Sequence, residues 1–257
     1  MNNNSLSKKL KNNQLLIGSW ITMAHPSIAE IMSKSGFDWL AVDLEHSVIT
    51  IREAEELIRI INLSGVTPLV RLTSNNADQI KRVMDAGAHG VIVPMISSVA
   101  DAKLAVEAVK YPPMGNRGFG LARAQEYGPG FKNYLDWQEE NTVVIVQIEH
   151  ILAVNNIEEI LAVDGVDGYI IGPYDMSGSM GIAGQFDSPD LIKAMDKVHD
   201  VAKRYNKPGG IHIVEPEPEQ LKQRVNEGHK FIAYSVDIRM LDCACRNGLT
   251  VLDRNQS

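Results

Sequence analysis

Two carboxylates and an imidazole follow an apolar stretch early in the chain, in the segment VDLEHS at residues 42–47. Asp43, Glu45 and His46 lie within four positions of one another, where the apolar run WLAV ends. Charged groups at the end of a buried strand cost free energy unless they are paired or used. Carboxylates bind metal ions or hold protons, and an imidazole is a general base near neutral pH. The segment therefore predicts part of a catalytic site.

Polar residues also end several later apolar stretches. Arg71 ends TPLVR, Gln147 and Glu149 end VVIVQIE, and Asp175 closely follows YIIGP. Carboxylates contributed by two different strands indicate a hard divalent cation such as Mg2+ or Mn2+, which takes oxygen ligands and keeps water. The structural alternative is that Glu149 and Asp175 pair with arginine or cap a helix.

Arg71 and His46 each allow two interpretations. Arg71 is either a bidentate clamp for a substrate carboxylate or the partner of a neighbouring acid in a salt bridge. A lone histidine is usually only hydrogen-bonded, but His46 stands beside Asp43 and Glu45, which favours a general base.

Other catalytic chemistries find little support. No lysine lies within the expected strands or at their carboxyl ends, which disfavours a Schiff base. The chain has no GxSxG motif, and the glycines from 172 to 184 do not fit GxGxxG.

The elements that must position these residues alternate regularly along the chain. We expect strands at 15–20, 39–43, 67–72, 90–95, 142–149, 167–173, 207–214 and 229–237. We expect helices from Pro26, over 51–63, 77–86 and 99–109, from Val154, over 189–205, from Pro218 and from Ile238. Eight such units in 257 residues predict a single-domain (β/α)8 TIM barrel, class α/β, with residues 1–13 as a flexible lead-in. A doubly wound open sheet is the alternative.

In such a barrel the carboxyl ends of all strands meet at one face, where the polar residues would converge. The net charge of -7 and the lack of a basic stripe disfavour nucleic acid as a partner. No apolar run approaches the roughly 20 residues that span a bilayer, and the polar N-terminus is not a secretory signal, so we expect a cytoplasmic protein.

Six stretches in order along the chain resemble the HpcH/HpaI aldolases, which are metal-dependent class II pyruvate aldolases on a (β/α)8 barrel. They are FDWLAVDLEHS (37–47), PLVRL (68–72), DAGAHGVIVPM (85–95), YPPMGNRGFG (111–120), VQIE (146–149) and GPYDMSGSMG (172–181). The resemblance implies reversible retro-aldol cleavage of a 4-hydroxy-2-oxo acid to pyruvate and an aldehyde. A 2-keto-3-deoxy sugar acid and a 2,4-dihydroxyhept-2-enedioate are examples of such substrates.

The resemblance also implies roles for individual residues. Glu149 and Asp175 would bind the metal, Mg2+ or Mn2+ first and Co2+ or Zn2+ next. Arg71 would hold the pyruvyl group and its enolate, and His46 would be the base, oriented by Asp85. Further contacts are implied for Gln147 beside the metal, for Gly172, Pro173 and Asp175 around the substrate carboxylate, and for Asp43 and Glu45 as supporting residues.

The resemblance implies a homo-oligomer, a hexamer built from trimers. The alternatives are a citrate-lyase-beta-like or malyl-CoA-like carbon–carbon lyase, and a barrel that binds without catalysis. Departures from the family pattern are VITIRE after DLEHS, His25, His212 and the acidic VEPEPEQ segment. These departures leave the aldehyde substrate open.

Overall fold

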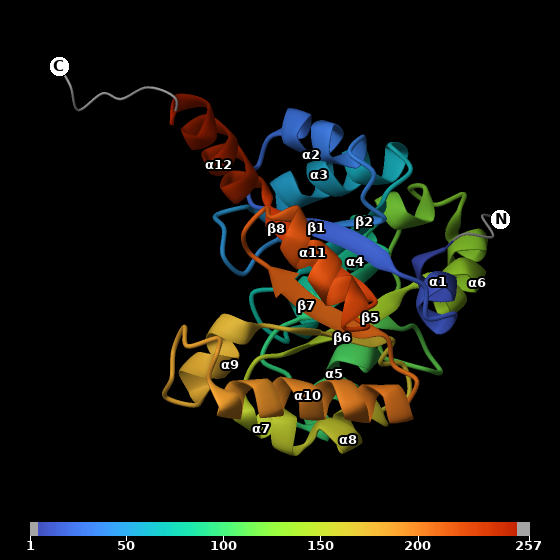
Figure 1. Ribbon diagram of the computed structural model, residues 1–257. Coiled ribbons are helices and arrows are strands. Elements are labelled where there is room, and N and C mark those ends of the chain that lie inside the picture. The colour runs from blue at the N-terminus through green and yellow to red at the C-terminus, as the bar shows by residue number, and fades with distance from the viewer. Residues whose placement is uncertain (1–4, 251–257) are drawn as a thin grey trace.

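Eight parallel strands close into a barrel in the computed structural model, which describes residues 5–250 (Figure 1). Each strand pairs with its neighbours in the chain, and β8 pairs with β1. The predicted (β/α)8 barrel is therefore confirmed, and the alternative of an open sheet is wrong. The strands are β1 (Leu16–Ile21), β2 (Trp39–Asp43), β3 (Thr67–Arg71), β4 (Gly90–Val93), β5 (Val143–Ile148), β6 (Gly168–Ile171), β7 (Gly209–Ile213) and β8 (Phe231–Val236).

Side chains alternate between the inside of the barrel and the surrounding helices, because successive strand residues point to opposite faces. The inner cluster includes Trp39, which stacks on Phe231 with ring centroids 4.4 Å apart. Gly18 makes room for that indole, since a Cβ atom there would lie 2.0 Å from the Trp39 ring. The outward residues pack against the helices in a second, larger cluster.

Helices surround the barrel and begin at its C-terminal face. Thr50 forms a capping box with Glu53 at the start of α3, and Asn76 and Ser98 cap the next two helices. The helices after the strands are α2 (Pro26–Ser33), α3 (Ile51–Leu63), α4 (Ala77–Asp85), α5 (Val99–Val109), α7 (Ile151–Asn155), α8 (Ile157–Leu161), α9 (Pro173–Ser179), α10 (Pro189–Arg204), α11 (Pro218–Asn226) and α12 (Asp237–Leu249).

Three helices lie where the sequence predicted none; one is α9 (Pro173–Ser179), which directly follows β6. The helix α6 (Phe131–Asn141) follows the 3-10 turn η1 (Arg123–Gln125) in the long connection before β5. The helix α1 (Leu6–Lys11) lies within the expected flexible lead-in, of which residues 1–4 are outside the described part of the chain. Leu6 and Leu10 join the inner cluster of the barrel. Since α1 directly precedes β1, it closes the N-terminal end of the barrel.

The replacement Leu10→Ala is expected to lower the free energy of unfolding by about 2 to 5 kcal/mol, the usual cost of an unfilled cavity in a core. Leu10 is only 1% exposed and belongs to the inner cluster. Urea unfolding followed by circular dichroism would measure the change. Lys11→Ala, on the exposed side of the same helix, is the control; equal midpoints for both variants would show that α1 does not stabilise the barrel.

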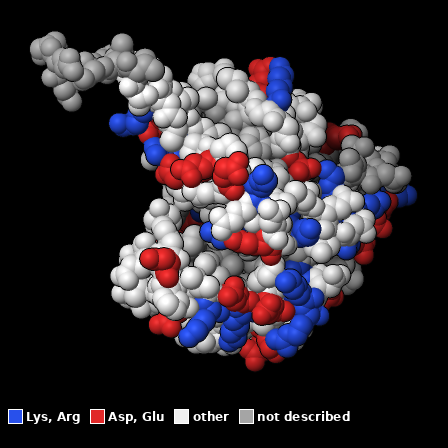
Figure 2. All heavy atoms as spheres, in the orientation of Figure 1, with Lys and Arg blue, Asp and Glu red and all other residues white. Residues whose placement is uncertain are grey.

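The last helix, α12, extends away from the barrel (Figure 1). Asp237 is its buried residue, whereas Ile238, Leu241 and Leu249 are each about half exposed. Acidic and basic side chains are interspersed over the face that Figure 2 shows. Among residues 5–250, no helix has the length and apolar character needed to cross a bilayer.

Candidate active site

Four side chains from alternate strands form one layer across the barrel near its C-terminal end. They are Trp20 from β1, Arg71 from β3, Gln147 from β5 and His212 from β7. Following the strand pairing from one of these residues to the strand after next leads to the position two residues before the next member of the layer. Barrels of this kind fill such layers mostly with branched apolar side chains. We call these four residues the polar layer, because Arg71, Gln147 and His212 place a guanidinium, an amide and an imidazole inside the barrel.

Arg71 is held in this layer by Asp43 on the adjacent strand. Its Nε donates to Asp43 Oδ1 at 2.9 Å and its Nη2 donates to Oδ2 at 2.6 Å. The guanidinium also lies over the Trp20 ring, 4.3 Å from its centroid. Asp43 is 1% exposed and Arg71 8% exposed, so this is a buried bidentate ion pair. Of the two interpretations of Arg71, the structure realises the salt bridge, with Nη1 still directed at Glu45 at 3.4 Å.

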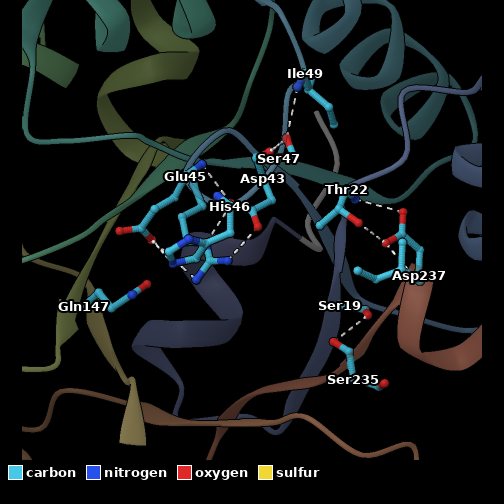
Figure 3. A network of polar contacts seen from close by, with 12 residues as sticks. Ser19, Thr22, Asp43, Glu45, His46, Ser47, Ile49, Gln147, Ser235 and Asp237 are labelled. Atoms are coloured by element: carbon cyan, nitrogen blue, oxygen red, sulfur yellow. Dashed lines mark hydrogen bonds and ion pairs between the residues drawn. The ribbon is translucent and has the colours of Figure 1, made fainter. Parts of the chain in front are cut away.

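The loop between β2 and α3 is organised around the same carboxylate (Figure 3). Asp43 Oδ1 accepts hydrogen bonds from the backbone N–H groups of Glu45 at 3.0 Å and of His46 at 3.3 Å, and Ser47 donates its hydroxyl to the Asp43 carbonyl. An aspartate commonly folds a turn in this way. The side chain of His46 is 63% exposed, and its Nε2 lies 3.8 Å from Glu45 Oε2. One aspartate therefore positions the arginine, the glutamate and the histidine.

Glu149 is buried opposite this loop. Its Oε1 accepts a 2.7 Å hydrogen bond from the backbone N–H of Met95, and Gln147 Nε2 donates to its Oε2. Met95 adopts a positive φ of 55°, which is uncommon for a residue with a side chain. Burial raises the pKa of Glu149, and these two hydrogen bonds oppose that rise.

The pKa of Glu45 is also affected by the other carboxylates at this end of the barrel. Burial raises its pKa to about 7, and the charge of Arg71 opposes that rise. The charges of Glu149, Asp43 and Asp175 raise the pKa of Glu45 further. Four carboxylates therefore lie close enough to repel one another, which is an arrangement that a bound cation would relieve.

Glu149 and Asp175 fit a hard divalent cation by their chemistry. Asp175, in the first turn of α9, lies near enough for its charge to raise the pKa of Glu149. Within residues 5–250 no three acidic, histidine or cysteine side chains converge into a complete metal site. Two carboxylates with open positions suit Mg2+ or Mn2+, which keep several waters, better than Zn2+, which prefers nitrogen and sulfur ligands.

Asp85 does not join this site, contrary to the role expected for it beside His46. It is the last residue of α4, which runs back from the C-terminal face, and it therefore lies at the opposite end of the barrel. Its neighbours there include Arg117 and Gln125, and burial raises its pKa. Within one chain, the acid that lies beside His46 is Glu45.

Gly172 and Pro173 join β6 to α9 directly beneath Glu149. Gly172 precedes the helix and Pro173 is its first residue. A Cβ atom on Gly172 would lie 2.9 Å from Glu149 Oε2 and 3.1 Å from Glu149 Cβ. Such contacts are closer than side chains tolerate, so the missing side chain allows Glu149 to occupy its place.

The replacement Gly172→Ala is accordingly expected to displace Glu149 and weaken Mn2+ binding at least tenfold, while the unfolding midpoint changes little. Isothermal titration with Mn2+ would measure the affinity. Gly178→Ala in the same helix is the control, because no atom lies within 4 Å of a Cβ atom there. Unchanged affinity in Gly172→Ala would mean that Glu149 does not bind the ion.

Two functional features escaped the sequence analysis. The Met95 backbone N–H supports Glu149 through a conformation that nothing in the residue type signals. Asp237, directly after β8, is an acid at the same end of the barrel that does not join these carboxylates. Instead its carboxylate accepts hydrogen bonds from Thr22, Met23 and Ile238, which ties the first loop to the start of α12 (Figure 3).

Comparison with known proteins places this geometry among related barrels. The family model described as HpcH/HpaI aldolase/citrate lyase matches residues 16–242. The chain is 37% identical to 2-dehydro-3,6-dideoxy-6-sulfogluconate aldolase of Pseudomonas putida, covering 96% of each chain. It is also 37% identical to hydroxypyruvate/pyruvate aldolase of Sagittula stellata, covering 94% of each. The crystal structure of an HpcH/HpaI aldolase from Desulfitobacterium hafniense DCB-2 superposes with a TM-score of 0.91 at 30% identity, covering 97% of each chain.

Proposed function

Because this chain belongs to the HpcH/HpaI aldolase/citrate lyase family, we propose that it is a metal-dependent aldolase. It cleaves a 4-hydroxy-2-oxo acid reversibly to a 2-oxo acid such as pyruvate and an aldehyde. The observation that carries this proposal is the buried Glu149, held by Met95 and Gln147 and facing the charge of Asp175. The relatives from Pseudomonas putida and Sagittula stellata are both named as aldolases, which favours this reaction over a CoA-dependent lyase.

In this proposal Glu149 and Asp175 hold Mg2+ or Mn2+. The bound ion would supply Lewis acidity at the oxygens of the 2-oxo acid, which lowers the cost of forming the enolate. Arg71 contributes positive charge beside the same oxygens, and its bidentate bond to Asp43 fixes the guanidinium before substrate arrives. Its Nη1, which faces Glu45, is the group available to the substrate.

His46 is the proposed base for the hydroxyl whose carbon–carbon bond breaks. Its exposed imidazole lies on the open side of the site, where the aldehyde half of the substrate extends. During cleavage it removes the proton from that hydroxyl, and during condensation it returns the proton to the new alcohol oxygen. Glu45 is placed to stabilise the protonated imidazole at 3.8 Å.

Release of pyruvate from a panel of 4-hydroxy-2-oxo acids, coupled to lactate dehydrogenase, tests the proposal. Release should require Mg2+ or Mn2+, stop with EDTA, and fall at least a hundredfold in His46→Ala. His25→Ala is the matched control, because His25 is an exposed histidine that caps α2 on the preceding loop. If the folded protein releases no pyruvate from any substrate of the panel, with either metal, the proposed activity is wrong.

We further propose that the chain assembles as a homo-oligomer, a hexamer. The half-exposed apolar side chains of α12, a helix that extends from the barrel, support an association of this kind. Light scattering coupled to size-exclusion chromatography measures the mass directly. A monomer at micromolar concentration would contradict the proposed assembly.

A further inference from the structure

Three buried polar atoms of the polar layer have no hydrogen-bond partner: Trp20 Nε1 and two others. The two others are His212 Nε2 and Gln147 Oε1, on the two strands that flank β6. Buried polar atoms in native proteins are normally satisfied, and each exception needs an explanation. Gln147 contacts the proposed metal ligand Glu149, and His212 belongs to the same layer of the barrel, so a bound molecule is the natural partner to consider.

His212 and Arg71 face each other across the barrel, and both contact the indole of Trp20. The His212 ring meets the edge of Trp20 with centroids 5.6 Å apart, and the guanidinium of Arg71 lies over that same indole. Burial and the charge of Arg71 lower the pKa of His212 to about 4, although the Ser235 backbone and Asp43 act in the opposite direction. The imidazole is therefore neutral near pH 7, and a neutral imidazole has one donor and one acceptor nitrogen.

Gln147 supplies a complementary group on the other side of β6. Its Nε2 is already committed to Glu149, so its free Oε1 can only accept. The partner that Gln147 requires is consequently a donor, while His212 can take either role. A hydroxyl group both donates and accepts, so it can serve both side chains at once, whereas a methyl group leaves both unpaired.

The geometry points to a specificity-determining role for His212: we propose that, together with Gln147 Oε1, it binds a hydroxyl on carbon 3 of the 2-oxo acid donor. The inference rests on the proposed function. In that function the ion and Arg71 take the oxygens of carbons 1 and 2, which leaves carbon 3 as the remaining part of the donor beside the polar layer. The preferred donor would then be a 3-hydroxy-2-oxo acid rather than pyruvate.

The reaction with such a donor balances in the same way as with pyruvate. Carbon 3 loses one proton and forms a bond to the aldehyde carbon, and the aldehyde oxygen takes one proton, giving a 3,4-dihydroxy-2-oxo acid. The relative from Sagittula stellata is named for both hydroxypyruvate and pyruvate.

Competition between hydroxypyruvate and pyruvate tests the assignment. The wild-type enzyme, with Mn2+ and glyceraldehyde as the acceptor, should show at least a tenfold higher kcat/KM for hydroxypyruvate. In His212→Leu the ratio of the two kcat/KM values should fall at least tenfold, with the loss falling mainly on hydroxypyruvate. His212→Gln, which keeps a hydrogen-bonding group, should recover most of the ratio, and His25→Leu should leave it unchanged.

The outcomes separate the two proposals. If His212→Leu lowers the rates with both donors equally, or leaves the ratio as in the wild type, His212 is structural and the inference is wrong while the aldolase stands. If the wild type yields no product with either donor, the proposed function fails and the inference fails with it. Circular dichroism of both His212 variants establishes that they fold, and His212→Gln decides the question if His212→Leu does not.

Discussion

Replacing Glu149 by glutamine is expected to reduce kcat/KM at least a thousandfold and to abolish Mn2+ binding, while the barrel stays folded. Glutamine has nearly the same shape, and its amide oxygen can still accept the hydrogen bond from Met95. It lacks the negative charge that a hard divalent cation requires, and one of only two proposed protein ligands is lost. Turnover with saturating metal and isothermal titration with Mn2+ measure the two effects.

A matched control is Glu215→Gln, another acid near the C-terminal face of the barrel. Glu215 forms an ion pair with Arg239 at 2.8 Å, and nothing places it beside the proposed metal. Its replacement should leave Mn2+ affinity within twofold of the wild type. If Glu149→Gln binds Mn2+ as tightly as this control, the assignment of the metal ligands is wrong.

The replacement Asp43→Asn is expected to lower the free energy of unfolding by roughly 3 to 5 kcal/mol, because it leaves the buried guanidinium of Arg71 without its counter-charge. Activity should fall at least a hundredfold as well, since the same carboxylate orients the loop that carries Glu45 and His46. Urea unfolding at pH 8 and the pyruvate-release assay measure the two losses.

The double variant Asp43→Leu with Arg71→Leu shows whether the loss comes from the unpaired charge. Removing both partners should cost less stability than the sum of the two single replacements, because neither charge remains buried alone. Asp78→Asn is a surface control: its salt bridge to Lys81, at 3.5 Å, is exposed and should contribute little. Strict additivity of the single effects would argue against a coupled pair.

The strands could be predicted because each is buried on both faces and reads as a nearly continuous apolar run. The helices α1 and α6 could not. The segment LSKKLK of α1 contains only two apolar residues, and docking of Leu6 and Leu10 into the barrel stabilises it rather than its own helical tendency. The helix α6 follows a glycine- and proline-rich stretch that resembled a long loop.

The site was predictable to the extent that strand ends identify it. Asp43, Glu45, His46 and Arg71 converge because β2 and β3 pair with Asp43 opposite Arg71. The bidentate ion pair between Arg71 and Asp43 depends on side-chain geometry, which a pattern of strand residues does not specify. Within one chain Asp85 lies far from His46, as a helix expected over 77–86, running back from the C-terminal face, already implied.

The filled interior of the barrel, closed at its base by the inner cluster and α1, has a kinetic consequence. Reactants and products share one opening, so the 2-oxo acid bound deepest must arrive before the aldehyde and depart after it. Cleavage should therefore follow an ordered release, with pyruvate competitive against the substrate in product inhibition and the aldehyde noncompetitive. Competitive inhibition by both products would instead indicate that either product can leave the site first.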